Sequence, residues 1–167
     1  KYTPVGDSLR NNLTALGEEL GLPYGDKAPF VVDIGSNNGL LLLGAKTMGA
    51  KVLGVEPAVK IGQQARDAGV PTITAFFDST VGDDIESRHG LVDAVVCTQT
   101  LQHIPGARAV VKHVARSLKP GGRFVVEGRY FIDTVESLTF DTIYHEMMSC
   151  FTLGSMRTLL SLEGFCI

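Results

Sequence analysis

The most constraining feature of this chain is an apolar run, Val31-Val32-Asp33-Ile34, which passes through Gly35 and Gly39 directly into Leu40-Leu41-Leu42-Leu43. A β-branched run followed by a glycine-bounded turn and then a helix is typical of α/β proteins, which bring backbone N–H groups up to a ligand at such a turn. The order predicts a buried strand of a parallel sheet and a crossover helix. It also predicts a ligand site where the strand ends.

Composition narrows the class of protein that carries this turn. The length of 167 residues corresponds to about one domain, and 44% hydrophobic with 20% charged residues is typical of a folded globular chain. The net charge of −3 gives no electrostatic basis for binding nucleic acid or an anionic membrane. No apolar run approaches the ~18 residues of a membrane span. We therefore expect a cytoplasmic protein with no nucleic-acid or membrane partner.

The cysteines and two of the histidines are expected to have structural roles. Cys97, Cys150 and Cys166 lie far apart and form no C-x-x-C pair, so we expect no metal site and no disulfide framework. Reduced thiols that fill core or pocket space are the simplest interpretation. His89 and His113 are interpreted as surface residues.

Strands and helices alternate along the chain. Residues 1–29 predict an N-terminal helical lead-in: a loop with Thr3-Pro4, a helix that Asp7 or Ser8 caps, and a stop that includes Gly25. Residues 30–167 predict one domain with strands at 30–34, 51–55, 71–77, 91–97 and 123–127 and a last helix before Gly164. This order indicates an α/β fold, a Rossmann-like, doubly wound, mostly parallel sheet with helices on both faces. The apolar run at 164–167 resembles the start of a further strand, so we expect a truncated sheet and a chain excised from a longer protein.

Polar and aromatic side chains collect where the predicted strands end, which is where such sheets bind ligands. Gly35, Asn37 and Gly39 follow the first strand, and Glu56 follows the second. The two oxygens of Glu56 match the vicinal diol of a ribose. The first loop lacks the G-x-G-x-x-G spacing that holds a pyrophosphate. With acidic Asp33 before it, the loop is better suited to a ligand with a cationic amino-acid end.

The third and fourth strands end in further candidates. Phe77 and Asp78 suit the face of an adenine ring and its exocyclic amine, and Thr98 ends the fourth strand. Phe76 and Phe77 alternate, so one is expected in the core and the other at the pocket. Asp78 is as well suited to cap the following helix as to contact adenine.

This combination resembles the class I S-adenosylmethionine (SAM) methyltransferases over nearly the whole chain. The segments Asp33–Gly39, Gly54-Val55-Glu56-Pro57, Gln102-His103-Ile104, Phe140–Glu146 and Phe151-Thr152-Leu153-Gly154-Ser155 are similar to the C-methyltransferases that act on nucleotide-linked deoxy-ketosugars. The resemblance implies that SAM is the cofactor and that Asp33, Gly35, Asn37, Gly39, Glu56, Phe77, Asp78 and Thr98 bind it.

The resemblance also implies a substrate, a reaction and further domains. The substrate would be a sugar nucleotide, methylated at a carbon alpha to its keto group after a base removes the proton. In that family the SAM domain lies between an N-terminal zinc-binding domain and a C-terminal domain that helps to hold the nucleotide-sugar. Both are expected in the full-length chain and outside this sequence.

The catalytic segment departs from the family pattern. The family usually reads Y-H-E-H, with the second histidine as the base, whereas this chain reads Tyr144-His145-Glu146-Met147. Methionine cannot accept a proton, so His145 or a residue outside this sequence would serve, or the substrate has diverged. Tyr144, His145 and Glu146 are the catalytic candidates. Histidine suits the base and a tyrosine hydroxyl suits the oxyanion.

Two other functions stay open on the sequence alone. An O- or N-methyltransferase on another small molecule is compatible with the missing base, and so is a non-catalytic module that binds SAM or a nucleoside. A dehydrogenase is disfavoured because the first loop lacks the pyrophosphate glycines.

Overall fold

A computed structural model describes residues 6–23 and 27–167. It contains a five-stranded sheet in the order β3-β2-β1-β4-β5, in which every pairing between neighbours is parallel. The strands are β1 (Phe30–Ile34), β2 (Lys51–Val55), β3 (Thr72–Ile73), β4 (Val92–Thr98) and β5 (Leu118–Glu127). The expected α/β fold with a doubly wound parallel sheet is confirmed.

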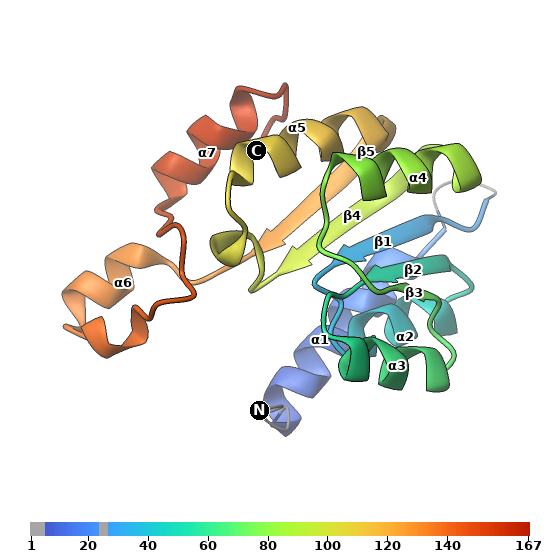
Figure 1. Ribbon diagram of the computed structural model, residues 1–167, viewed down its shortest axis with the longest axis horizontal. Coiled ribbons are helices and arrows are strands. Elements are labelled where there is room, and N and C mark those ends of the chain that lie inside the picture. Colours follow the sequence, from blue (N-terminus) through green and yellow to red (C-terminus); the bar gives the residue numbers. More distant parts are fainter. Residues whose placement is uncertain (1–5, 24–26) are drawn as a thin grey trace.

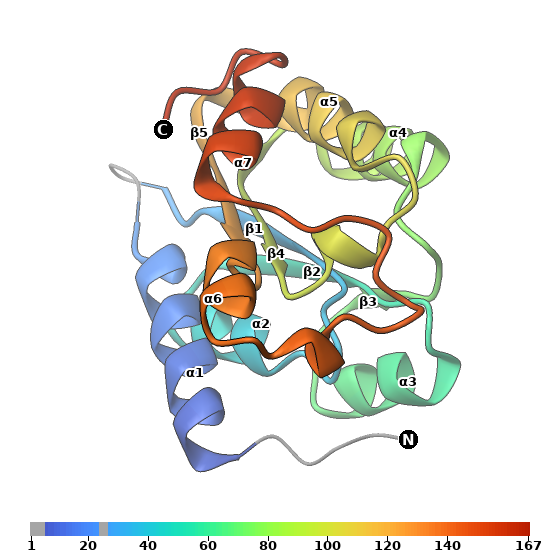
Figure 2. The same cartoon turned by 90° about the vertical axis from the view of Figure 1, so that its left-hand side faces the viewer.

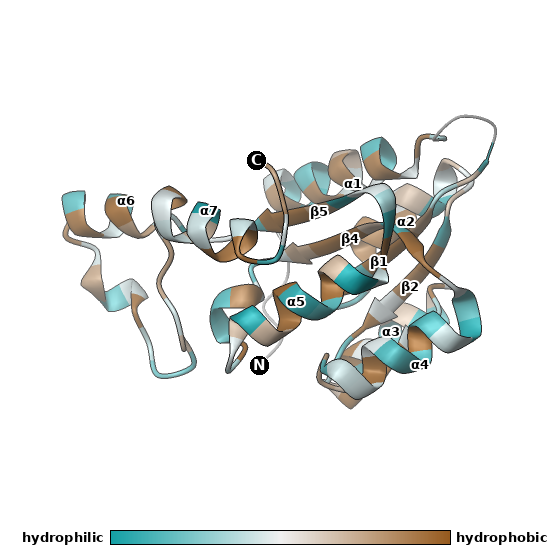
Figure 3. Ribbon diagram, turned by 90° about the horizontal axis from the view of Figure 1, so that it is seen from above, coloured by the Kyte–Doolittle hydropathy of each residue, from teal (hydrophilic) through white to brown (hydrophobic). Residues whose placement is uncertain are grey.

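The α-helices lie on both faces of the sheet (Figure 1). They are α1 (Asp7–Gly21), α2 (Leu40–Thr47), α3 (Val59–Asp67), α4 (Ser79–His89), α5 (Ala107–Ser117), α6 (Phe131–Glu136) and α7 (Leu153–Ser161), with short 3₁₀ turns η1 (Leu101–His103) and η2 (Phe140–Thr142). In Figure 2 the sheet lies between one layer of α1, α2 and α3 and another of α4, α5 and α7. Apolar residues run along the strands, while parts of α4 and α5 are hydrophilic (Figure 3).

Alternate residues of the central strands supply two separate cores. Val32 and Ile34 of β1 pack in one cluster with Ile85 of α4 and Val111 of α5, whereas Val31 packs in the other cluster with residues of α1, α2 and α3. All five residues of β1 are buried. Burial on both faces explains why this strand is a continuous apolar run.

The third and fifth strands differ most from the expectation, and β4 (Val92–Thr98) is shifted by one residue from the expected 91–97. The third strand was expected at 71–77, but β3 has only two residues, because its neighbour β2 ends at Val55 and Val55 is the partner of Ile73. An edge strand loses its pairing when its one neighbour turns away. β5 begins at Leu118 instead of residue 123, because Val92 pairs with Leu118 before an irregularity shifts the register.

The expected N-cap of α1 and the expected final strand were wrong. The first helix starts at Asp7, and its N-cap is Gly6 without a side-chain hydrogen bond, so neither Asp7 nor Ser8 caps it. Residues 165–167 have no strand assignment. The expectations for Thr3-Pro4 and Gly25 lie outside the described residues.

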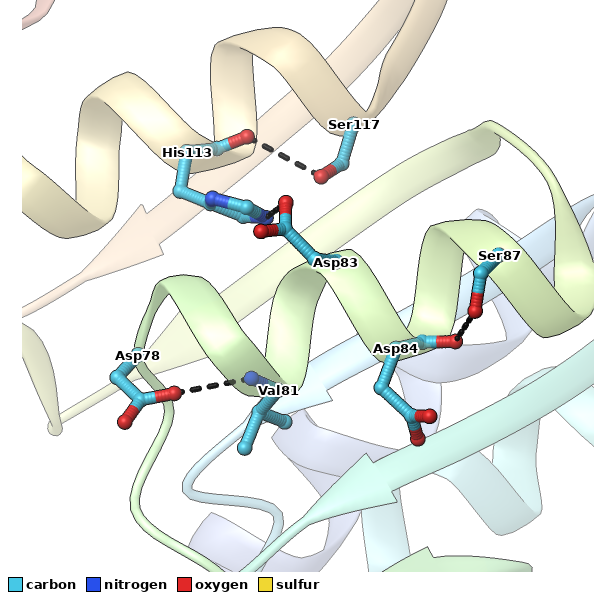
Figure 4. A network of polar contacts seen from close by, with 7 residues as sticks. All are labelled: Asp78, Val81, Asp83, Asp84, Ser87, His113 and Ser117. Carbon is cyan, nitrogen blue, oxygen red and sulfur yellow. Dashed lines mark hydrogen bonds and ion pairs between the residues drawn. The ribbon is translucent and has the colours of Figure 1, made fainter.

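His113 is a core residue, contrary to the expected surface position. It is 4% exposed on α5, and its ring lies where a side chain on Gly82 of α4 would be, 1.9 Å from an added Cβ. Its Nε2 is 3.8 Å from Oδ1 of Asp83. Figure 4 draws this contact between α4 and α5. Glycine at position 82 therefore permits α4 and α5 to approach closely.

The cysteines divide between core and surface. Cys97 is buried, and burial raises the pKa of its thiol to about 12, whereas Cys150 and Cys166 are exposed. Cys97 fills the core as expected, and Cys166 lines a cavity beside β5 and α7. The interpretation was wrong for Cys150.

None of the helices in residues 6–23 and 27–167 has the length and apolar character of a membrane span. In that same part of the chain, no group of three or more His, Cys, Asp or Glu side chains is arranged to hold a metal ion.

Candidate functional site

The loop after β1 is a tight turn that depends on its glycines. Gly35 has φ +77°, and a Cβ added there would lie 2.3 Å from the hydroxyl oxygen of Thr100. Gly39 has φ +79° and is the N-cap of α2. Asn37 between them also has a positive φ, of 50°. The backbone is therefore held in a conformation that leaves little side-chain bulk in front of the strand ends.

Glu56 fastens this loop to the turn after β2. One carboxylate oxygen accepts the Asn37 N–H at 2.9 Å, and the other accepts the Ala58 N–H at 2.8 Å. Each oxygen of a carboxylate has a second lone pair, so both can still accept a hydroxyl of a vicinal diol. The predicted ribose contact is therefore compatible with the structural role of Glu56.

Asp33 is a buried carboxylate whose hydrogen-bonding capacity is not fully satisfied by the described residues. It is 2% exposed, and neither its Oδ1 nor the hydroxyl of neighbouring Ser36 has a hydrogen-bond partner among the described residues. Burial, and secondarily the charge of Glu56, raises the pKa of Asp33 to about 7. An unpaired buried carboxylate is stabilised by a cation or a hydrogen-bond donor. The site thus fits a ligand that carries an amino group.

Two cavities open on either side of the loop. The larger, of about 590 Å³, is lined by Glu56, Phe76, Phe77, His103 and their neighbours, which is a typical size for a cofactor site. The smaller, of about 200 Å³, is lined by Asp33, Thr98, Gln99, Glu127 and the α1 residues Leu9 and Leu13, among others. Both cavities are lined by Gly35, Asn37 and Thr100, so they are neighbours on the two sides of the first loop.

The two phenylalanines divide as the alternation predicts. Phe77 packs on the core and meets the ring of His113 edge-on at 5.9 Å, whereas Phe76 is 80% exposed. Both line the larger cavity. Phe76 therefore joins Phe77 as a candidate for stacking on an adenine ring, since its ring face has no such core partner.

Asp78 caps α4. Its carboxylate accepts the Val81 N–H at 2.9 Å, which satisfies one of the open donors at the start of the helix (Figure 4). Asp78 was expected either to cap this helix or to contact adenine, and the observed contact is the cap. The adenine contact stays a prediction.

A polar chain lies at the ends of β4 and β5. Thr98 pairs with Glu127 across the two strands, and the next residue, Gln99, has a positive φ of 51°. The Gln99 amide donates to the Glu127 carboxylate at 3.1 Å. Strained backbone of this kind gathers at functional sites, because the surrounding structure must hold it in place.

The predicted catalytic segment returns to this end of the sheet. The Phe131 N–H donates to the Phe151 carbonyl at 2.9 Å. Residues 131–151 therefore form a long excursion from the sheet whose two ends are hydrogen-bonded to each other. The N–H groups of Met148 and Ser149 donate to the carbonyl of Gln102 in η1. Figure 2 shows α6 and the chain that follows it in front of the strand ends.

Within this segment the structure brings Tyr144 and Glu146 to His103. The Tyr144 hydroxyl is 3.4 Å from Nε2 of His103, and Nδ1 of His103 is 3.0 Å from the carbonyl oxygen of Glu146. The side chains of His145 and Glu146 are exposed. Neither His145 nor Met147 is among the described residues that line the two cavities.

Among the cavity residues that sequence reasoning missed are two on α1 and one after β4. Leu9 and Leu13 appear in the sequence only as the apolar stripe of a packing helix, and Thr100 as a residue after a strand end. Their place at the cavity depends on how α1 crosses α2 and how Thr100 meets Gly35. No sequence signal indicates either contact. His103 belongs to the Gln102-His103-Ile104 segment of the family resemblance. From the sequence it could cap the following helix or satisfy a backbone carbonyl, and its Nδ1 contacts the carbonyl oxygen of Glu146.

The chain is similar to known methyltransferases, both in a family model and in individual proteins. The family model for a methyltransferase domain matches residues 8–167. The C-methyltransferase NovU of Streptomyces niveus is 42% identical over 147 residues, 88% of this chain and 34% of NovU. The ubiquinone biosynthesis O-methyltransferase of Sodalis glossinidius is 34% identical over 96 residues, which are 55% of this chain and 38% of that protein. The chain thus spans about a third of the length of these relatives.

Solved structures agree on the fold. A SAM-dependent methyltransferase from Archaeoglobus fulgidus superposes with a TM-score of 0.72 at 17% identity, covering 94% of this chain and 69% of that one. The family match spans almost all of the described residues, including every strand of the sheet. The chain therefore belongs to the family of SAM-dependent methyltransferases.

Proposed function

We propose that this domain transfers a methyl group from SAM to a carbon alpha to the keto group of a nucleotide-linked deoxysugar. The observation that carries the proposal is the 42% identity to a C-methyltransferase over 88% of the chain. The match extends beyond the cofactor half of the fold to the segment around Tyr144 that resembles the ketosugar enzymes.

In this proposal the first loop and its neighbours hold the cofactor. Bound SAM supplies an electrophilic methyl carbon on a sulfonium. Asp33 receives the amino group, which gives its unpaired oxygen a cationic partner. Glu56 accepts the ribose hydroxyls, and Phe76 or Phe77 covers the adenine in the larger cavity. The approach to the cofactor is kept narrow by Gly35, Asn37, Gly39 and Thr98. Asp78 contributes by capping the start of α4.

The substrate side is proposed to lie between η1 and the residue 131–151 excursion. Positioning is the protein's main contribution to methyl transfer, because orientation alone can supply about 7–11 kcal/mol of the barrier. The carbon acid also needs a base and a donor for the enolate oxygen. Tyr144 is proposed as the donor and Glu146 as a substrate contact. From the sequence alone, His145 is the candidate base within this chain. Segments of the full-length protein outside this chain are proposed to help hold the nucleotide.

A calorimetric titration tests the cofactor half of the proposal. SAM is expected to bind the protein, and NAD is not. Tight NAD binding without SAM binding would contradict the proposal.

A methylation assay tests the substrate half. The full-length protein is incubated with SAM and a dTDP-4-keto-deoxysugar in D2O. Deuterium is expected to enter at the alpha carbon and a C–CH3 group to form there. Absence of both would count against C-methylation.

O-methylation of another small molecule is the second candidate. It is supported by the 34% identity to a ubiquinone biosynthesis O-methyltransferase, which covers only 55% of the chain. The NMR shift of the transferred methyl carbon distinguishes O–CH3 from C–CH3. A methylated product without alpha exchange would favour this candidate.

A further inference from the structure

His103 has the two contacts that define a histidine base. Its Nδ1 lies 3.0 Å from the backbone carbonyl oxygen of Glu146. A carbonyl oxygen only accepts hydrogen bonds, so Nδ1 carries the proton in this contact. In the neutral ring the other nitrogen, Nε2, then has the lone pair. The Glu146 backbone therefore fixes the tautomer that can take a proton at Nε2.

The basic nitrogen faces a hydroxyl group. The Tyr144 oxygen is 3.4 Å from Nε2, and the two ring centroids are 5.7 Å apart. Because Nε2 has no hydrogen in this tautomer, the hydroxyl donates and Nε2 accepts. At 3.4 Å this bond is long. Little hydrogen-bond energy is therefore lost when a substrate separates the pair. Its C–H bond can then face Nε2, and its keto oxygen can accept the hydroxyl of Tyr144.

His103 is also in the right place. It lines the larger cavity, together with Glu56 and Phe76, so it belongs to the region proposed to hold the cofactor. The segment that carries Glu146 is fixed to the same turn by the N–H groups of Met148 and Ser149, 2.8 and 3.1 Å from the Gln102 carbonyl. His145 is exposed and does not line this cavity. Met147 has no basic atom.

We propose that His103 is the base of the methylation, with Glu146 orienting its ring through the backbone and Tyr144 binding the enolate oxygen. The inference rests on the proposed function. The lone pair of Nε2 takes the alpha proton, and the C–H electrons pass to the keto oxygen. They then return to form the new C–CH3 bond as the C–S bond breaks onto sulfur. His103 releases its proton to water, so charge and atoms balance.

Deuterium exchange at the alpha carbon tests the assignment separately from methyl transfer. The full-length protein is incubated in D2O with a dTDP-4-keto-deoxysugar and S-adenosylhomocysteine, which has no methyl to transfer. His103→Asn keeps a donor near the position of Nδ1 and removes Nε2. Its exchange rate is expected to fall by about 100-fold or more. For His103→Ala, added imidazole is expected to restore part of the exchange, which a merely structural role would not allow.

Controls separate the possible outcomes. His89→Asn, a substitution of an exposed histidine on α4, is expected to exchange at the wild-type rate. Thermal unfolding verifies that each variant folds. Exchange that persists in folded His103→Asn but disappears in His145→Asn overturns the assignment and leaves the proposed function intact. If the wild-type protein exchanges no deuterium and transfers no methyl, the proposed function itself fails, and the assignment fails with it.

Discussion

At the residue scale, Asp33 couples stability to cofactor binding. Its pKa is about 7 in the folded protein and near 3.8 in the unfolded chain. The folded state therefore holds a proton that the unfolded state has lost, and the free energy of unfolding falls as pH rises from about 4 to about 7. Asp33→Asn should remove this decline, which amounts to up to ~4 kcal/mol. Urea unfolding of both proteins at pH 5 and pH 8 measures the difference, and equal pH slopes would contradict the burial argument.

The same carboxylate should make SAM binding depend on pH. Only the ionised form attracts an amino group, so the affinity of the wild-type protein should rise as pH passes through about 7. Asp33→Asn should weaken binding by about ten- to a hundredfold at pH 8 and flatten this dependence. Titration calorimetry at several pH values gives both results. A variant that binds as tightly as the wild type would show that the amino group lies elsewhere.

Phe76 and Phe77 form a matched pair for the adenine contact. Phe76 is 80% exposed, so Phe76→Ala should leave stability within about 0.5 kcal/mol while weakening SAM binding severalfold. Phe77 packs on the core, and Phe77→Ala should cost about 2 kcal/mol. Chemical unfolding and calorimetry on both variants separate the two roles. A large loss of stability in Phe76→Ala would contradict this division.

At the element scale, the contact between α1 and α2 depends on glycines. A Cβ on Gly17 of α1 would lie 2.0 Å from the carbonyl oxygen of Leu41, and one on Gly44 of α2 would lie 2.5 Å from that of Thr14. Backbone oxygens cannot move away as a flexible side chain can. The two helices therefore pack backbone to backbone, and this contact sets the position of Leu9 and Leu13 at the smaller cavity.

Gly17→Ala should therefore destabilise the protein by about 1–3 kcal/mol and also weaken SAM binding, because α1 must shift. Gly154→Ala is the control, since its Cβ would meet its nearest neighbour at an ordinary 3.8 Å. Thermal unfolding and calorimetry on both variants provide the comparison. An undisturbed Gly17→Ala would mean that the helices do not approach this closely.

At the scale of the whole molecule, the cofactor should stabilise the entire sheet. The proposed cofactor contacts lie at the carboxyl ends of β1, β2 and β4. A ligand that binds there, and only to the folded state, stabilises all three strands together. SAM at about 100 times its Kd should raise the free energy of unfolding by about 2.7 kcal/mol. A thermal shift series with SAM, and with NAD as the matched control, measures it. A shift with NAD and none with SAM would contradict the proposed cofactor.

The sequence alone determined the order of the strands along the chain, the parallel sheet and the cofactor loop. These depend on local patterns: β-branched runs, a glycine-bounded turn and acids at strand ends. The length of β3 did not follow from its own residues, because it depends on where β2 ends. Likewise the burial of His113 depends on a glycine in another helix.

Only the tertiary structure decided which side chains meet at the catalytic end. The sequence places His145 beside Tyr144, but the fold brings Tyr144 to His103, 41 positions earlier, and turns the Glu146 carbonyl to the same ring. Neighbours along an irregular segment point in different directions, whereas η1 is held by the end of β4. The first loop was predictable because its own glycines, Gly35 and Gly39, set the turn. The contacts of His103 were not predictable, because both of its partners lie in one segment, 41 and 43 positions further along the chain.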